Sequence, residues 1–287
     1  MVLEQIRRAA PIRLYAHCDG PRQGIKSDLK NVGAVHALIE REGPGICTEL
    51  RTLFRTENLG LRRGVYEALN WFFSQEECGI ILEDDCVPDL SFFTYCEDLL
   101  NQYRDEKQVM HIAGSNLAEK TCRHISTSYL FSNLAFVWGW ASWRRAWQQM
   151  QIDLNGLDAF ERNNELERFL DDPIARKYLQ DKFEETRAKK NNSWAYAWLY
   201  SIMQNEGLCI VPKVNLIQNK GIGSENATNT RKRSKRASLQ AQAMEFPMVH
   251  PDRIQVQKHL ELVFFYKTQK SRWRLKIWGL LRTLGLR

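Results

Sequence analysis

Three consecutive acids, Glu83, Asp84 and Asp85, end an apolar run in the segment GIILEDDCVPDLSFF, residues 79–93. The apolar run predicts a buried strand, and burying an unpaired carboxylate costs several kcal/mol. Acids at the end of such a strand must therefore be exposed to solvent, bind a cation or both. Carboxylate oxygens select Mg²⁺ or Mn²⁺, and so few of them leave coordination positions for phosphate oxygens and water. A solvated acidic loop is the alternative interpretation.

A second strand end carries polar residues that could join the same site. Asp19 follows the apolar segment IRLYAHC, residues 12–18, in an Asp-Gly-Pro turn. Ligands of open parallel sheets bind beyond the carboxyl ends of the strands, so we expect the HCDG and LEDD ends to meet at one crevice. Because side chains alternate along a strand, Glu83 and Asp85 should face one way and Asp84 the other.

The elements that must position these acids alternate between helix and strand. Apolar spacing predicts helices over residues 2–10, 28–42, 58–75 and 91–105, and strands over 12–21, 49–56, 79–85 and 109–114. Beyond residue 125, the sequence predicts a charged helical stretch over 157–189, an apolar helix over 192–204 and two short strands over 208–219. This α/β order indicates a mostly parallel central sheet covered by helices.

The ordered series of motifs resembles GT-A-type glycosyltransferases. In NLGLRRGVYEALNWFF, followed by GIILEDDCVPDLSFF, an N-x-G helix precedes a strand that ends in an acidic motif of the DxD kind. The segments DGPR, VWGWASWRRAW and VNLIQNKGIGSENAT extend the likeness to a bacterial HlpA-like, or hemolytic-protein-like, group related to eukaryotic α-mannosyl N-acetylglucosaminyltransferase I. The likeness covers roughly residues 2 to 230.

The resemblance implies a GT-A fold, the Rossmann-like architecture of nucleotide-diphospho-sugar transferases. It implies a metal-dependent, inverting transfer from a UDP-sugar, with N-acetylglucosamine as a candidate sugar and Mn²⁺ or Mg²⁺ as cofactor. The acceptor would be a glycan or a lipid-linked molecule of surface polysaccharide synthesis. Residues 1–124 would bind the nucleotide-sugar, residues 125–250 would form the acceptor-side half of the same domain, and residues 251–287 would be a basic amphipathic tail.

Carried over residue by residue, the resemblance assigns roles to the acids at both strand ends. Asp19 would read the nucleotide base, and Asp84 would lie near the ribose or the donor sugar. Asp85 would be the direct metal ligand, with Glu83 beside it in the donor site. Arg62 could reach the diphosphate, although a basic residue in the first turns of a helix more often lies in solvent.

The tryptophans of VWGWASWRRAW could supply a wall for the acceptor, because an aromatic face complements the apolar face of a pyranose. Tryptophans usually belong to the core instead. We expect Trp143 and Trp147 to pack inside, whereas Trp138 and Trp140, which flank Gly139, are candidates for acceptor contact. His111, at a strand end, is expected to be a satisfied core histidine.

The chain departs from the group in two places. Relatives begin with another strand before the first helix, so the sheet is expected to lack its first strand here. Relatives also carry an acid near the start of the SWxYxW helix, where this chain reads NNSWAYAW without a carboxylate. Glu225, in GIGSENAT, is the candidate general base, with Glu184 and Glu185 as alternatives and a solvated loop acid as the competing interpretation of Glu225.

Charge and cysteine usage limit the remaining classes of function. The formal net charge is +7 over 287 residues, but residues 231–236 and 270–287 hold more cations than this whole excess, so the rest of the chain is slightly acidic. A nucleic-acid-binding protein is therefore a weaker alternative than a catalytically weak relative that binds nucleotide-sugar or glycan without turnover. Seven cysteines without a CxxC pair favour the reducing cytoplasm over a disulfide framework or a zinc site.

No window of the sequence approaches the roughly 20 apolar residues of a membrane span. The segment KSRWRLKIWGLLRTLGLR, residues 270–287, instead has apolar residues at helical spacing among cations. That pattern is typical of a helix in peripheral contact with an anionic membrane, here the inner face of the cytoplasmic membrane. A helix that docks onto its own domain is an equal alternative.

Overall fold

The structure of the chain is a computed structural model that describes residues 1–222 and 239–269. Glu225, the cluster TRKRSKR and the basic segment 270–287 lie outside the described residues. The elements in chain order are α1 Val2–Ala9, β1 Arg13–Cys18, α2 Lys26–Glu42, η1 Gly43–Gly45, β2 Glu49–Phe54, α3 Gly60–Gln75, β3 Cys78–Ile81, β4 Cys86–Pro88, α4 Ser91–Gln102, β5 Val109–Ala113, α5 Glu119–Cys122, β6 Tyr129–Ser132, β7 Trp140–Trp143, α6 Arg144–Trp147, α7 Leu157–Arg162, η2 Glu165–Arg168, α8 Pro173–Arg187, α9 Trp194–Gln204, β8 Leu208–Pro212, β9 Ile217–Asn219 and α10 Lys258–Thr268.

The predicted alternation of the first 113 residues is confirmed, with helices α1 to α4 and strands β1, β2, β3 and β5 at the expected places. Strand β3 is shorter than expected, since it ends at Ile81 and leaves the three acids in the turn before β4. β1 and β2 pair in parallel from Arg13–Glu49 to Cys18–Phe54. The early part of the chain therefore folds as the α/β order predicts.

The central sheet is mixed, so the prediction of a mostly parallel sheet is wrong. Five strands lie in the order β3-β7-β5-β8-β6, and only β5 and β8 pair in parallel. β7 runs antiparallel to its neighbours β3 and β5, and β6 runs antiparallel to its neighbour β8. A further antiparallel ribbon pairs β4 with β9.

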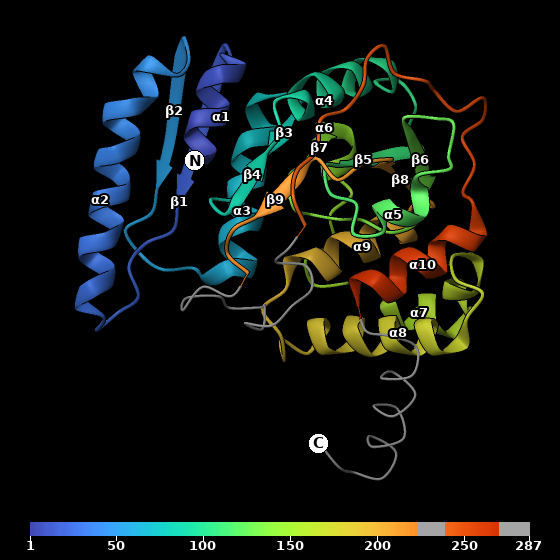
Figure 1. The fold of residues 1–287 in the computed structure, drawn as a ribbon. Helices are drawn as coiled ribbons and strands as arrows, with labels where there is room; N and C mark the ends of the chain where they lie inside the picture. The colour runs from blue at the N-terminus through green and yellow to red at the C-terminus, as the bar shows by residue number, and fades with distance from the viewer. Residues whose placement is uncertain (223–238, 270–287) are drawn as a thin grey trace.

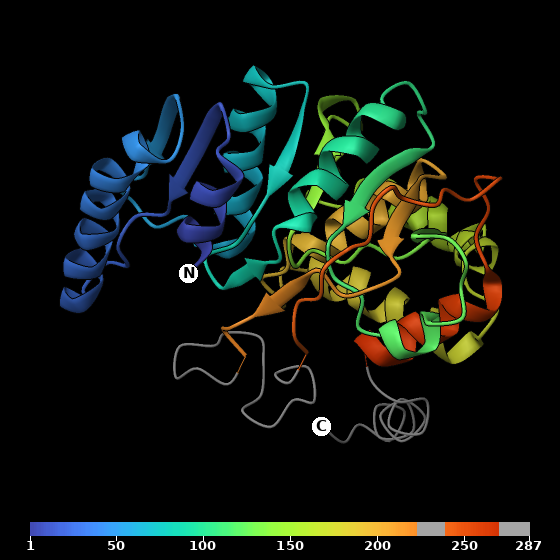
Figure 2. The ribbon, with the colours of Figure 1, turned by 45° about the horizontal axis from the view of Figure 1, so that its top comes forward.

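β1 and β3 belong to different sheets, and none of the residues 1–222 and 239–269 forms a strand that joins them. Helix α3 connects the two parts instead. The ring of Phe72 lies 5.0 Å from that of Tyr15 in β1, and a Cβ added to Gly79 in β3 would lie 2.3 Å from the same Phe72 ring. Figures 1 and 2 show β1, β2 and α2 on one side of α3 and the five-stranded sheet on the other.

Two apolar cores cover the two faces of the five-stranded sheet. On one face, Ile112 of β5 and Ile210 of β8 pack with Leu99 and other residues of α4. On the other face, Ala113 of β5 and Val211 of β8 pack with the helices α3, α8, α9 and α10. The alternation of neighbouring strand residues between the cores is the expected pleat. The sheet thus forms the middle layer of a sandwich of helices (Figure 1).

The expected functional halves are parts of one packed body. β5 lies before residue 124 and β6, β7 and β8 lie after it, yet all four are in one sheet. The described part of the expected tail also joins this body, because Leu260, Phe264 and Phe265 of α10 are buried in the core with α8 and α9. None of the described helices is long and apolar enough to cross a membrane.

Candidate functional site

The acidic triplet lies in a tight turn between β3 and β4. The backbone N–H of Cys86 donates to the carbonyl of Glu83 at 3.1 Å, which closes the turn. Ligand atoms of Glu83, Asp85 and Cys86 lie within 4.8 Å of one another, while Asp84 is exposed. Glu83 and Asp85 are close together as expected, but β3 ends at Ile81, so the turn and not the pleat of a strand brings them together.

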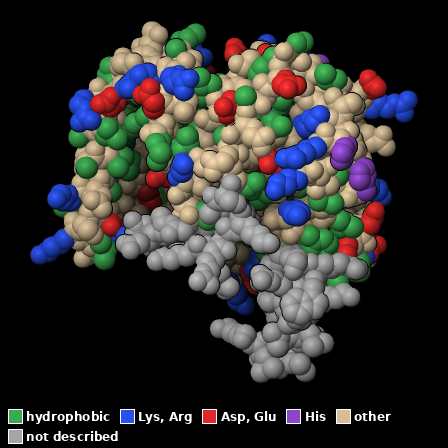
Figure 3. Space-filling view, in the orientation of Figure 1, with side chains coloured by type: hydrophobic (Ala, Val, Ile, Leu, Met, Phe, Trp, Pro, Cys, Tyr) green, Lys and Arg blue, Asp and Glu red, His purple; other side chains and the backbone are tan. Residues whose placement is uncertain are grey.

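The carboxyl ends of β1 and β3 meet as the sequence predicts. Burial raises the pKa of the Cys18 thiol at the end of β1, and the charges of Asp19 and Asp84 raise it further. Asp84 therefore lies close enough to the end of β1 to act on it electrostatically. The space-filling view shows a hollow on this face of the molecule, left of centre, with acidic side chains in its wall (Figure 3).

The electrostatics of the turn favour a cation. Burial raises the pKa of Glu83 to about 7, and the charges of Asp85 and Asp84 add to the shift. A divalent cation between Glu83 and Asp85 would remove the repulsion that raises this pKa. Two carboxylates suit Mg²⁺ or Mn²⁺, and they would leave most of the coordination shell to other oxygens.

Cys86 fits this cation less well than the two carboxylates do. Burial raises the pKa of its thiol far above the usual range, and the charges of Glu83 and Asp85 raise it further. A protonated thiol is a poor ligand, and hard cations prefer oxygen. The donor set is therefore Glu83 and Asp85, which agrees with the expected ligand Asp85 and with Glu83 beside it.

Asp19 caps the start of helix α3. Its carboxylate accepts the backbone N–H groups of Leu59 at 2.9 Å and Gly60 at 2.9 Å, and the side-chain amide of Asn58 at 3.0 Å. Gly20 donates a further backbone hydrogen bond at 3.0 Å. These donors occupy both oxygens, so in this structure Asp19 orders the loop beside the crevice, and its role in reading the base stays a prediction.

Arg62 lies inside the molecule rather than at the acids, with 8% of its surface exposed. Its guanidinium donates to the carbonyl of Thr186 at 3.0 Å and to that of Ile152, and it approaches Asp153 at 3.4 Å. These contacts tie α3 to the end of α8. The expected approach of Arg62 to a diphosphate is wrong in this structure, because buried carbonyls hold its side chain.

The two candidate tryptophans, Trp138 and Trp140, differ in burial. Trp140 is fully buried and stacks with His111 and Trp194 at ring distances of 5.1 and 5.7 Å, so its expected contact with an acceptor is wrong. Trp138 is partly exposed and packs against the same core as Leu82, the residue before the acids. Trp138 therefore remains the aromatic candidate at the site.

The other core predictions are confirmed. Trp143 and Trp147 are buried. His111 is fully buried, and its Nδ1 accepts the indole N–H of Trp198 at 3.2 Å. Its Nε2–H therefore donates to the carbonyl of Phe136 at 3.1 Å, which satisfies both ring nitrogens.

The general base is not assigned by the described residues. Ser193 caps α9 through its hydroxyl, and the first turn of that helix contains no acid. Glu184 accepts from Arg187 at 2.7 Å, and Glu185 accepts from Lys182 at 2.5 Å, so both alternatives are in ion pairs on α8. Glu225 lies outside the described residues and stays the candidate from the sequence.

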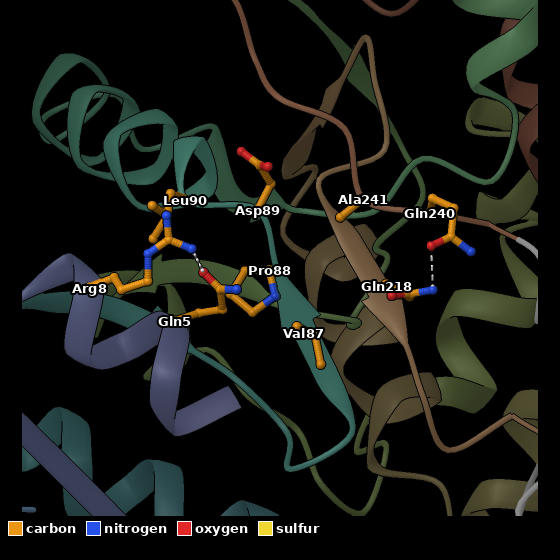
Figure 4. Close-up of a pocket in the computed structure, with 9 residues that line it drawn as sticks. All are labelled: Gln5, Arg8, Val87, Pro88, Asp89, Leu90, Gln218, Gln240 and Ala241. Atoms are coloured by element: carbon orange, nitrogen blue, oxygen red, sulfur yellow. Dashed lines mark hydrogen bonds between the residues drawn. The ribbon is translucent and has the colours of Figure 1, made fainter. Parts of the chain in front are cut away.

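Sequence reasoning missed the segment that completes the turn. Asn219, the last residue of β9, and Lys220 and Gly221, which follow it, all contact Asp85. The signal was present as the N-x-G of IQNKGIG, but nothing in the sequence links it to an acid so far away. A pocket of about 260 Å³ lies on the ribbon beside this turn, lined by α1 residues Gln5 and Arg8 and by the paired amides of Gln218 and Gln240 (Figure 4).

Comparisons with known proteins leave the family open. A scan against protein-family models found no match, and a search of curated proteins found no match either. The function is therefore argued from the site.

Proposed function

We propose that the protein is a metal-dependent glycosyltransferase that uses a UDP-sugar. The observation that carries the proposal is the pair Glu83 and Asp85, whose ligand atoms lie within 4.8 Å of each other in the turn between β3 and β4. Paired carboxylates that follow a strand of an α/β fold, one of them Glu83 with its pKa raised by burial, are typical of a site for a cation and a phosphorylated ligand. The motif resemblance described above supports the same assignment.

The chemistry requires charge neutralisation at the leaving group. A bound Mn²⁺ or Mg²⁺ would supply this neutralisation as the UDP phosphates take up negative charge. Glu83 and Asp85 would hold the cation, and Asp84, on the β1 side of the turn, would accept hydrogen bonds from ribose or sugar hydroxyls. N-acetylglucosamine is the candidate sugar from the resemblance.

Inversion at the anomeric carbon needs an acceptor hydroxyl on the face opposite the diphosphate. The bond from the acceptor oxygen forms as the bond to UDP breaks, and a general base takes the hydroxyl proton. Glu225 is our candidate for that base. Trp138 would contact an acceptor sugar, and the acceptor would be a glycan or lipid-linked molecule, consistent with action at the inner face of the cytoplasmic membrane.

A binding protein without turnover is the second candidate, favoured by the acid-free first turn of α9. Release of UDP from UDP-N-acetylglucosamine, UDP-glucose and UDP-galactose, with Mn²⁺ or with a chelator, separates the two. A transferase releases UDP in the presence of Mn²⁺ but not in the presence of the chelator, and Asp85→Ala abolishes the release. Nucleotide binding without release of UDP from any donor would identify the binding protein. Salt-sensitive binding to DNA or RNA that ignores Mn²⁺ and UDP would contradict both.

A further inference from the structure

Asp85 lies between two chain segments that are distant in the sequence. Its own neighbour Cys86 pairs with Asn219 in the β4–β9 ribbon, and the backbone N–H of Lys220 donates to the Asp85 carbonyl at 2.8 Å. Asn219 and Asp85 are 134 residues apart. The backbone of the acid is thus fixed by a segment that is not part of the acidic motif.

The side chain of Asn219 is oriented by its own segment. Its Oδ1 accepts the backbone N–H of Gly221 at 2.9 Å, and because an N–H can only donate, the accepting atom must be the oxygen. The Nδ2 group is then directed at the carboxylate of Asp85, at 3.4 Å from Oδ1. The thiol of Cys86 also donates to this Oδ1 at 3.3 Å, so one oxygen of Asp85 has two donors.

The other oxygen of Asp85 lies against Gly221. A Cβ added at Gly221 would lie 2.1 Å from Oδ2 and 3.0 Å from Cγ of Asp85. Gly221 does not have the positive φ that favours glycine, so its backbone conformation would accept alanine. The close approach of the carboxylate is the feature that requires glycine here.

We propose that Asn219 and Gly221 are positioning residues for the cation ligand Asp85. Asn219 fixes the rotation of the carboxylate through Oδ1, and Gly221 leaves the space in which Oδ2 lies. The inference rests on the proposed function, because it concerns the same cation site. Groups that orient metal ligands typically change metal affinity 10- to 100-fold when they are removed.

The test is a titration of the full chain with Mn²⁺ in the presence of UDP. Electron paramagnetic resonance measures the free Mn²⁺ at each step. Gly221→Ala and Asn219→Ala should each weaken Mn²⁺ binding at least about 10-fold. Both should leave the unfolding temperature nearly unchanged, since the short Asp85 side chain can rotate away at little cost in stability. Gly33→Ala is the matched control, because a Cβ added at Gly33 has no heavy atom within 4 Å.

The outcomes separate this inference from the proposed function. If the wild type binds Mn²⁺, Asp85→Ala does not, and both variants bind as the wild type does, then the positioning role is wrong and the proposed function stands. Weaker binding that follows a matching fall in unfolding temperature would show a merely structural role and would also overturn the inference. If the wild type binds no Mn²⁺ with UDP present, the proposed function itself fails.

Discussion

The buried carboxyl of Glu83 has a measurable consequence. Its pKa is raised to about 7, chiefly by burial, and a bound cation would favour its charged form. We predict that Mn²⁺ binding at pH 7 releases about half a proton, the fraction expected when the pH equals the pKa. Calorimetry in buffers of different ionisation enthalpy measures this release. Glu83→Gln should abolish it, and a binding heat that is independent of the buffer would contradict the prediction.

Trp138 and Trp140 are two residues apart and differ in role. Trp140 is fully buried among Trp147, Trp194 and Trp198, so Trp140→Ala should lower the free energy of unfolding by about 3–5 kcal/mol. Trp138→Ala, at a partly exposed position, should cost clearly less. Urea denaturation of both variants provides the comparison. Equal losses would show that Trp138 is also a core residue and not an acceptor contact.

At the scale of elements, the start of α3 depends on Asp19. Asp19→Ala should lower the free energy of unfolding by about 1–2 kcal/mol, because two backbone N–H groups of α3 lose their acceptor. Asp19→Asn is the comparison variant, since its single amide oxygen keeps the bonds to one carboxylate oxygen, whereas its NH₂ group cannot accept those made to the other. Urea unfolding and UDP affinity are measured for both. An Asn variant with normal stability but without UDP binding would support the prediction that Asp19 recognises the nucleotide base.

The sequence predicted the elements better than it predicted their pairing. Apolar periodicity located α3 and β3, but β3 ends at Ile81, so the three acids lie in a turn that the pleat does not govern. Strand pairing is non-local, and nothing near Trp140 in the sequence shows that it pairs with Ala113 on one side and Ile81 on the other. That pairing buries Trp140 and makes the sheet mixed, which explains both corrections.

The candidate site was predictable only in part for the same reason. The acids are contiguous in the sequence, so their residue types alone predict a cation site. Asn219 and Gly221 contact Asp85 only because the β4–β9 ribbon brings the two segments together. Arg62 was misassigned because its partners, the carbonyls of Ile152 and Thr186, leave no signal in the sequence. Contacts made by the backbone of distant segments are the part that sequence patterns do not contain.

At the scale of the whole molecule, the attachment of α10 should make stability depend on pH. Glu261 of α10 is 2% exposed, its Oε2 accepts the backbone N–H of Asn133 at 2.9 Å, and burial raises its pKa to about 7. The folded state therefore binds this proton more tightly than the unfolded state, whose carboxyl has a pKa near 4.5. This contribution is fully present below pH 4.5 and is lost as the pH rises to about 7.

We predict that the wild type loses up to about 3 kcal/mol of unfolding free energy from this group between pH 5 and pH 8. Glu261→Gln, which carries no titrating proton, should show a flatter dependence and be more stable than the wild type at pH 8. Urea titrations of both proteins across this range measure the effect. A variant that follows the wild-type slope would exclude Glu261 as its source.

The central claim is that the turn at Glu83 and Asp85 binds a nucleotide diphosphate through a divalent cation. The most direct test is calorimetric titration of UDP into the protein with Mn²⁺ and with a chelator, together with Asp85→Ala and the exposed-acid control Asp105→Ala. We predict UDP binding that requires Mn²⁺, disappears in Asp85→Ala and persists in Asp105→Ala. UDP binding that is unchanged by the chelator and by Asp85→Ala, or its absence from a folded wild-type chain, would contradict the assignment.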